Sequence, residues 1–285
     1  MKHKIIKPLK GGSDESVVNL IEIDGKHYVH KKAPKKTIIG EKFFHRTLDR
    51  NGLPSFQMFA EYEDGDNDVV FEYVENSPSL NENRSIDNFA KLGLVVSDMH
   101  DITYSDFFNI DDEGNPTVSS WSNQLAKYIQ QNFDEFLEVN NESKQFSQEE
   151  VRKIEELIKP LAFHNFDKYS LVHGDMHTGN VMMKDGQPIP YDSFGEFMVA
   201  PAVYDLGLIL SEEFNSSLFV EGDDEKYQRN KEHLDAFMDT YGRDKIETQM
   251  DLVKRFALLR AMGRFPNPWK DNQVEMMKNI LKSYS

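Results

Sequence analysis

The chain has 285 residues, and none of them is cysteine. Disulfide bonds, catalytic thiolates and zinc sites built on cysteine are therefore excluded. By itself, this absence says little about the cellular compartment.

Long hydrophobic runs are also missing. No stretch approaches the length needed to span a membrane, and the first residues, MKHKIIKPLKGG, lack the continuous apolar segment of a signal peptide. We therefore expect a cytoplasmic protein without a membrane partner. The hydrophobic content of 39% and charged content of 29% are those of an ordinary globular protein, with enough length for one large or two medium domains.

Basic residues are few relative to acidic ones. The chain has 33 Lys and Arg against 49 Asp and Glu, for a formal net charge of −16. This balance disfavours a nucleic-acid partner, because proteins that bind a phosphate backbone usually carry a basic face. Residues 1–75 contain 12 basic and 13 acidic residues, whereas residues 76–285 contain 21 and 36. The acidic part either attracts a cationic small molecule or only keeps an exposed surface soluble.

Polar residues suited to chemistry are concentrated in residues 171–195, LVHGDMHTGNVMMKDGQPIPYDSFG. Apolar residues flank the polar ones, which predicts short buried strands that end at the polar positions. Asp175 and Asn180 share a glycine-bearing loop, where a carboxylate can meet a substrate hydroxyl and an amide oxygen can meet a metal ion. Asp192 follows a hairpin-like turn and can supply a second metal ligand, since Mg²⁺ prefers oxygen ligands.

The same segment resembles a known family. HGDMHTGN followed by YDSFGE is similar to the H-x-D-x-x-x-x-N motif and the metal-binding Asp motif of the aminoglycoside phosphotransferase and choline kinase superfamily, relatives of the protein kinases. The resemblance implies that Asp175 is the catalytic base and that Asn180 and Asp192 bind Mg²⁺ during phosphoryl transfer from a nucleotide. It implies a structural role for His173, as a packed organiser of the loop.

These residues allow two other interpretations. A single Asp or Asn in a glycine-bearing turn is more often a turn former, because its side chain bonds readily to its own backbone. The joint spacing of His173, Asp175, Asn180 and Asp192 favours catalysis instead. A metal-dependent hydrolase could use His173, Asp175 and His177 as ligands, but no further His or Cys motif at ligand spacing accompanies them.

The N-terminal part predicts a small antiparallel sheet with one helix. Asp24-Gly25 is a strong hairpin signal, and residues 38–50 have helical spacing with Gly52 placed to end the helix. Five strands are expected, at residues 5–9, 17–23, 27–32, 56–61 and 69–74. Residues 1–74 would form a nucleotide-binding lobe.

Within this lobe, the resemblance implies the nucleotide-binding residues. A glycine-bearing loop lies between the first two expected strands, where backbone N–H groups can approach phosphates. Its candidate residues are Gly12, Ser13 and Ser16. The backbone from Glu72 to Val74 would be the hinge that hydrogen-bonds adenine, and the choice between ATP and GTP stays open.

Lys31 is the candidate for the lysine that contacts the nucleotide phosphates, because Tyr28-Val29-His30-Lys31 resembles the strand that carries it. Lys32 is the alternative, and alternation along a strand allows only one of the two to face the cleft. In relatives a helix Glu pairs with this lysine, and Glu41 occupies that place.

Residues 75–285 would form a mainly helical lobe with the catalytic loop and the acceptor pocket. An amphipathic helix is expected at residues 85–100, ending at a structural His100. Residues 102–161 read as a helical substrate subdomain, with helical patterns at 121–128, 133–139 and 149–158. Asp205 resembles the family's Asp that opens a buried helix and braces the catalytic loop, and helix N-capping is its simpler role.

The sequence therefore predicts an α+β, two-lobed protein-kinase-like fold. The expected function is transfer of the γ-phosphoryl group of Mg²⁺-bound ATP or GTP to a hydroxyl of a small, cationic acceptor, with an aminoglycoside-like compound favoured. Choline, an amino sugar, thiamine or methylthioribose would use the same machinery. A nucleotide-binding pseudoenzyme is a further alternative, disfavoured because Lys31, Glu41, Asp175, Asn180 and Asp192 are all present.

Overall fold

The computed structural model describes residues 3–9, 16–111, 113, 115–193, 197–219, 225–265 and 272–284. The chain folds into two compact units. The first unit comprises Met1–Arg84, Asn109–Thr117 and His173–Met198, and the second Ser85–Phe108, Val118–Val172 and Val199–Ser285. The first unit thus includes the segment with Asp175 and Asp192. The lobe boundary predicted at residue 74 stays a prediction.

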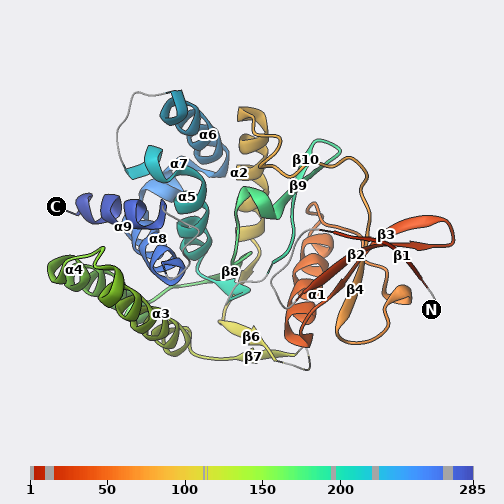
Figure 1. Ribbon diagram of the computed structural model, residues 1–285, viewed down its shortest axis with the longest axis horizontal. Helices are drawn as coiled ribbons and strands as arrows, with labels where there is room; N and C mark the ends of the chain where they lie inside the picture. Colours follow the sequence, from red (N-terminus) through yellow and green to blue (C-terminus); the bar gives the residue numbers. More distant parts are fainter. Residues whose placement is uncertain are drawn as a thin grey trace. The chain divides into compact units, whose positions relative to one another are not determined.

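The first unit is built on an antiparallel sheet of four strands in the order β1-β2-β3-β4. The strands are β1 (Lys4–Pro8), β2 (Val17–Ile23), β3 (Lys26–Lys32) and β4 (Asp68–Glu72). Asp24 and Gly25 both have positive φ angles, of 50° and 75°, as the predicted hairpin between β2 and β3 requires. Helix α1 (Lys35–Arg50) packs on this sheet, on the side of β4 (Figure 1).

The fifth predicted strand does not form. Residues 56–61 lie beside β4 and are held there by two backbone hydrogen bonds. Phe59 N–H donates to Val70 O at 2.8 Å, and Glu72 N–H donates to Gln57 O at 2.9 Å. Only Met58 forms a bridge with Phe71, and the chain then turns into the short 3₁₀ helix η1 (Ala60–Tyr62). The prediction of five strands is therefore wrong by one, although the segment occupies the sheet edge.

The core of this unit lies between the sheet and α1. Buried apolar side chains come from the sheet, from α1 and from the later hairpin, so one core joins segments far apart in sequence. Its buried members are Ala33, Ile38, Phe56, Val69, Phe71 and Ile189. The hairpin consists of β9 (Val181–Lys184) and β10 (Gln187–Pro190), preceded by the 3₁₀ helix η3 (Thr178–Asn180). A separate two-stranded ladder is formed by β6 (Phe108–Ile110) and β7 (Pro116–Val118).

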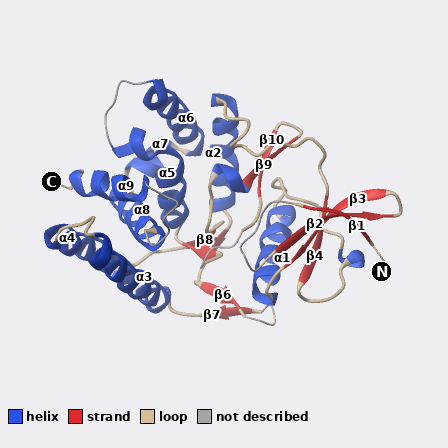
Figure 2. Cartoon of the chain, viewed as in Figure 1, coloured by secondary structure: helices blue, strands red, loops and turns tan. Residues whose placement is uncertain are grey.

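The second unit is mainly helical, as the colouring of Figure 2 shows. Its helices are α2 (Ile86–His100), α3 (Trp121–Ser143), α4 (Gln148–Ile158), η2 (Lys159–Phe163), α5 (Ala202–Phe219), α6 (Glu225–Tyr241), α7 (Arg243–Glu247), α8 (Met250–Arg264) and α9 (Asn272–Lys282). A short sheet of order β11-β8-β5 accompanies them, formed by Val199–Ala200, Tyr169–Leu171 and Thr103–Tyr104. The helix break predicted at residues 221–224 lies outside the described residues.

Local sequence explains several helix boundaries in the second unit. The hydroxyls of Ser85 and Ser120 accept backbone N–H bonds at the starts of α2 and α3. Ser147 and Glu150 form a complete capping box at the start of α4. The two helices predicted at 121–128 and 133–139 are one continuous helix, α3, because no glycine or proline interrupts the segment.

Close packing of α2 on α6 requires a glycine. A Cβ atom at Gly93 would lie 2.4 Å from the backbone oxygen of Phe237 and 2.3 Å from the hydroxyl of Thr240. That hydroxyl donates a 2.6 Å hydrogen bond to Ala90 O, so a side chain of α6 bonds directly to the backbone of α2. The sheet of the first unit and the helices of the second confirm the predicted α+β class. Among the described residues, no helix is both long and apolar enough to cross a membrane.

Candidate active site

The register of β3 decides between the two candidate lysines. Lys31 pairs with Val18 on β2 and Val69 on β4, and its side chain is 6% exposed. The neighbouring Lys32 side chain is 54% exposed and points to the other face. Lys31 is therefore the lysine that the sheet turns toward the interior of the first unit.

Lys31 is held by two carboxylates. Its Nζ lies 2.8 Å from Glu41 Oε2 on α1 and 2.5 Å from Asp192 Oδ1, which follows β10. Burial alone would lower the pKa of Lys31, but the two carboxylates outweigh this effect and raise the pKa above its usual value. Burial raises the pKa of Glu41, and the charge of Lys31 opposes that rise. The ammonium is therefore charged at neutral pH and fixed in position.

The loop after β8 brings Asp175 and Asn180 into contact. Asn180 Nδ2 donates hydrogen bonds to the backbone oxygen of Asp175 at 2.9 Å and to its carboxylate Oδ2 at 3.4 Å. A Cβ atom at Gly179 would lie 2.8 Å from the ring of His177, so a larger residue there would displace this ring. The Nδ1 atom of that ring accepts the Gly179 N–H at 3.0 Å. The loop conformation therefore depends on its own side chains.

His173 joins the loop to the segment that carries Asp192. Its Nδ1 accepts the backbone N–H of Asp175 at 3.3 Å, so its Nε2–H donates to Tyr191 O, which lies 2.8 Å away. Both ring nitrogens are thus bonded to backbone, and the side chain is buried. The hydrolase alternative, which needs a His173 nitrogen for a metal ion, does not fit this arrangement.

Tyr191 ties the same two segments together a second time. Its backbone N–H donates to Asn180 O at 2.9 Å, and its hydroxyl donates to Gly179 O at 2.8 Å. Burial raises the pKa of the tyrosine, so the hydroxyl remains a donor. The following residue, Asp192, has a positive φ angle of 57°, a conformation that Asp tolerates better than most residues. These contacts fix Asp192 beside Lys31.

One pocket of about 790 Å³ lies within the first unit, and its lining includes Lys31, Glu41, Asp175, His177, Gly179, Asn180, Tyr191 and Asp192. One part of its wall is apolar and comes mainly from the sheet and the hairpin, with Val18, Val29, Phe71 and Met182. The polar wall contains Lys31, Glu41, Asp175, Asn180 and Asp192. An apolar pocket with a few convergent polar groups is the usual form of a small-molecule site.

The predicted hinge and phosphate-loop residues divide between described and undescribed parts of the chain. Glu72, Val74 and Ser16 line the pocket, whereas Gly12 and Ser13 lie outside the described residues. The Glu72 carboxylate is bound by Lys184 Nζ at 2.6 Å and by Gln57 N–H at 3.0 Å. The Glu72 side chain therefore holds residues 72–74 in place. Contact with a ligand is left to the backbone of these residues.

Asp205 belongs to the second unit. It lies inside the first turn of α5 rather than before the helix, so the simple N-capping role is wrong. It is fully buried, and its Oδ2 lies 3.3 Å from Nε2 of His100 at the end of α2. The other nitrogen of His100 is 2.9 Å from the hydroxyl of Tyr241 on α6. Asp205 and His100 thus link α5, α2 and α6.

His45, which no motif in the sequence singles out, lines the pocket one helical turn after Glu41. The side chain is 0% exposed, and neither ring nitrogen has a hydrogen-bond partner within the part of the chain that the structure describes. Burial lowers the pKa of His45 to about 3, with smaller contributions from His173 and Lys31. The i, i+4 spacing from Glu41 was the only sequence signal that could have placed His45 on the same helix face.

Comparison with known proteins identifies the class of protein. The sequence matches the phosphotransferase enzyme family over residues 5–245, so the chain belongs to this family. It is a phosphotransferase that acts on an alcohol group. No curated protein sequence matches the chain.

Solved structures show the same fold at low sequence identity. A candidate fructosamine-3-kinase from Thermobifida fusca YX-ER1 has a TM-score of 0.61 and 16% identity, covering 98% of this chain and 95% of that one. A thermostable mutant of aminoglycoside phosphotransferase APH(4)-Ia, in ternary complex with ADP and hygromycin B, has a TM-score of 0.62 and 12% identity, covering 98% and 94%. The Plasmodium vivax ethanolamine kinase has a TM-score of 0.57 and 12% identity, covering 99% and 81%. The predicted kinase-like fold is thereby confirmed.

Proposed function

We propose that the chain transfers the γ-phosphoryl group of ATP to a hydroxyl of a small, cationic molecule. The observation that carries this proposal is the convergence of Lys31, Glu41, Asp175, Asn180 and Asp192 on one pocket. They come from β3, α1, the loop after β8 and the segment after β10, and hydrogen bonds or ion pairs link them. Phosphoryl transfer needs this kind of site, because its catalysis is mostly positioning and charge stabilisation.

Each side chain has a role that follows from its contacts. Asp175 is the proposed base: it takes the proton of the acceptor hydroxyl as the hydroxyl oxygen bonds to the γ-phosphorus. The bond between that phosphorus and the β–γ bridging oxygen breaks, and ADP leaves. Lys31 is the proposed partner of the nucleotide phosphates, oriented by Glu41. His173 and Tyr191 are positioning residues, because they hold Asp175 and Asp192 through the backbone.

The oxygen donors of the pocket fit a hard divalent cation. Asn180 uses its amide nitrogen to bind Asp175, which directs its amide oxygen away from that carboxylate. Asp192 contacts Lys31 through Oδ1, so its second oxygen is a further candidate ligand. Asn180 and Asp192 would hold Mg²⁺, which supplies charge neutralisation of the phosphates when bound. An all-oxygen donor set is the one that Mg²⁺ prefers.

Nucleotide binding is supported by the form of the pocket and by the neighbours. The apolar wall suits a flat base, and the backbone of residues 72–74 borders it as the proposed hinge. APH(4)-Ia was determined with ADP and hygromycin B, which makes ATP the first nucleotide to test.

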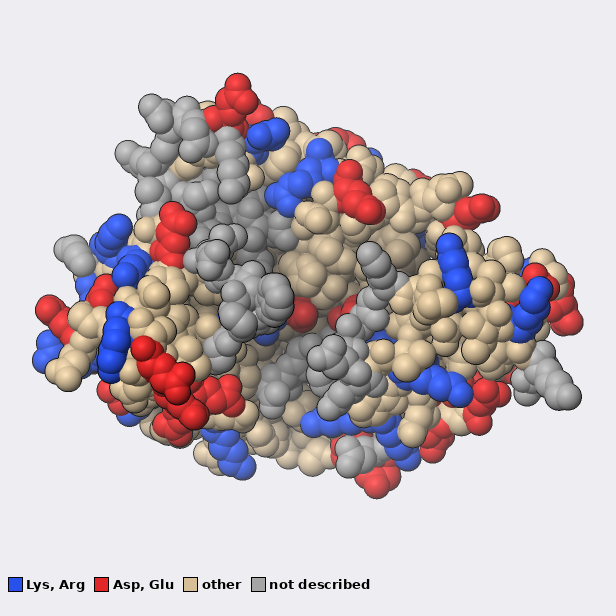
Figure 3. All heavy atoms as spheres, viewed as in Figure 1, with Lys and Arg blue, Asp and Glu red and all other residues tan. Residues whose placement is uncertain are grey.

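The acceptor is proposed to be aminoglycoside-like because the chain has a net charge of −16 and a neighbour binds hygromycin B. On the face shown in Figure 3, however, Asp and Glu lie among Lys and Arg side chains instead of forming one acidic surface. The net charge therefore favours a cationic acceptor but does not identify which cationic compound it is. Fructosamines and choline-like amino alcohols belong in the same test.

The test is Mg²⁺-dependent release of ADP by the purified protein, alone and with a panel of aminoglycosides, fructosamines, choline, thiamine and methylthioribose. Asp175→Asn is the test variant. Asp185→Asn is its matched control, since Asp185 is an exposed turn residue with a positive φ angle that Asn also tolerates. The expected result is that an acceptor stimulates ADP release by the wild type and by Asp185→Asn, but not by Asp175→Asn. Tight ATP binding with no turnover for any acceptor, in the wild type, would instead favour a pseudoenzyme.

A further inference from the structure

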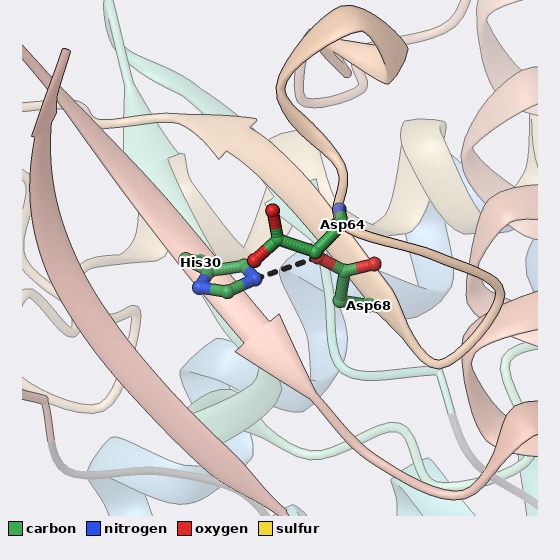
Figure 4. A group of neighbouring side chains, drawn as sticks. All are labelled: His30, Asp64 and Asp68. Carbon is green, nitrogen blue, oxygen red and sulfur yellow. Dashed lines mark hydrogen bonds and ion pairs between the residues drawn. The ribbon is translucent and has the colours of Figure 1, made fainter. Parts of the chain in front are cut away.

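Strand β3 presents a second group of polar side chains next to Lys31. Because neighbouring residues on a strand point to opposite faces, His30 faces away from the pocket that Lys31 lines. Figure 4 shows His30 beside Asp64, in the segment that leads into β4, and Asp68, the first residue of β4. The side chains of His30 and Asp68 are only 2% and 3% exposed, so these two residues are buried on the far face of the sheet.

We propose that His30, Asp64 and Asp68 form a binding site for a divalent transition-metal ion, separate from the catalytic pocket. One ligand atom from each residue lies within 4.8 Å of the other two, the arrangement needed to share one ion. A ring of a second histidine, His3, packs edge-on against His30 with centroids 4.8 Å apart. The ligands therefore come from two segments, β3 and residues 64–68, and the His3 ring from a third segment packs against His30.

The buried part of the site is already held in place. Asp68 accepts the backbone N–H groups of Asp64 and Gly65 at 2.8 and 3.0 Å, which fixes its carboxylate toward His30. His30 Nε2 and Asp68 Oδ2 lie 2.8 Å apart, so a metal ion bound by both would replace their hydrogen bond. The imidazole would then carry its hydrogen on Nδ1. Preorganised ligands with bonded partners are typical of metal sites in proteins.

The donor set indicates which ions fit. One imidazole nitrogen and two carboxylate oxygens suit Zn²⁺, Co²⁺ or Mn²⁺, whereas Mg²⁺ prefers oxygen ligands alone. Two carboxylates also balance the charge of a divalent ion, which would replace the 3.8 Å ion pair between Asp64 and Lys32. Asp64 is the exposed member of the group, with 37% of its side chain exposed, and gives the ion a route from solvent.

A metal ion here would join two parts of the nucleotide-binding sheet. His30 and Asp68 are 38 residues apart, and β3 and β4 between them carry Lys31 and the proposed hinge. Binding to the folded state alone raises stability by mass action. The ion would therefore stabilise the strand that positions Lys31 without entering the catalytic pocket.

The test uses metal-free protein in an Asp192→Asn background, which weakens metal binding at the catalytic pocket. Into this background we would place Asp64→Asn or its matched control Asp66→Asn. Asp66 lies in the same turn and is 79% exposed, but is not part of the ligand group. Neither change removes the backbone N–H groups that hold Asp68, so both variants should fold, which circular dichroism checks.

Each protein is titrated with Co²⁺ and followed by its visible absorption, with Zn²⁺ and thermal unfolding as the second measurement. The expected result is one equivalent of Co²⁺ bound by the background protein and by Asp66→Asn, with at least tenfold weaker binding by Asp64→Asn. Zn²⁺ should raise the Tm of the first two proteins only. Equal binding by the Asp64 and Asp66 variants, or no Co²⁺ bound by the background protein, would overturn the proposal. Neither readout depends on turnover, so the proposed kinase activity is tested independently.

Discussion

The ammonium group of Lys31 lies 2.5 Å from the carboxylate of Asp192, although 161 positions separate the two residues in the chain. This contact joins the N-terminal sheet to the segment with the proposed metal ligand. It also means that Lys31 is bound by carboxylates on two sides, so nucleotide phosphates would have to share or displace the Asp192 contact.

Replacement of Asp175 by Asn should lower kcat by roughly 10²–10⁴-fold, because an amide cannot accept the proton of the acceptor hydroxyl. The nucleotide Kd and the Tm should change little, since Asn keeps the shape of the side chain. Steady-state kinetics, nucleotide titration and thermal unfolding measure the three quantities. A kcat within tenfold of the wild type would show that Asp175 is not the base.

Replacement of Lys31 by Met should lower the free energy of unfolding by about 3 kcal/mol, because Glu41 would remain buried without its cation. It should also abolish measurable nucleotide binding. Lys32→Met is the matched control on the same strand, and its effect should stay within about 0.5 kcal/mol because Lys32 is exposed. Urea denaturation with nucleotide titration tests both. Equal effects of the two substitutions would contradict the assignment.

His45 should make the protein less stable in mild acid. Its pKa is about 3 in the folded protein against 6.5 in the unfolded chain. Between pH 3 and pH 6.5, the unfolded chain therefore binds a proton that the folded protein does not bind. The stabilisation is fully present above pH 6.5 and is lost as the pH falls toward 3. At pH 5 the unfolding free energy is lower by about 2 kcal/mol than at pH values well above 6.5.

The variant that tests this is His45→Phe, which places a further ring among Phe56 and Phe71. Its unfolding free energy should fall less than that of the wild type between pH 7.5 and pH 5. At pH 7.5 the variant should be close to the wild type or above it, because no hydrogen bond of the ring is lost. Parallel pH profiles for the two proteins would be inconsistent with a buried neutral imidazole.

His173→Leu should reduce kcat at least tenfold while the nucleotide Kd stays within a few-fold. The substitution leaves the Asp175 N–H and Tyr191 O without their partner, so the unfolding free energy should fall by roughly 2 kcal/mol. His164→Leu, at an exposed position, is the control for loss of an imidazole. A variant with normal kcat but reduced stability would assign His173 to the fold alone.

Part of the fold could be predicted because its signals are local. The hairpin at Asp24-Gly25 depends on residues within one turn, and it was found. The strand predicted at residues 56–61 failed because an apolar pattern does not show where a segment bends into a 3₁₀ helix, as it does after Phe59. The gap predicted within α3 failed because polar residues such as Asn132 are compatible with a helix, and its side chain bonds Tyr128 O.

The sequence by itself determined the family, because HGDMHTGN and YDSFGE place the chemical groups of one loop and one hairpin at fixed short spacings. Spacing within a few residues is set by the covalent chain, and so it can be read directly. Tertiary structure decided the rest: which lysine faces the pocket, that Glu41 and Asp192 both contact it, and that His45 and the His30–Asp68 pair are buried. Those facts depend on strand register and on packing between segments far apart in the chain, which a single sequence does not encode locally.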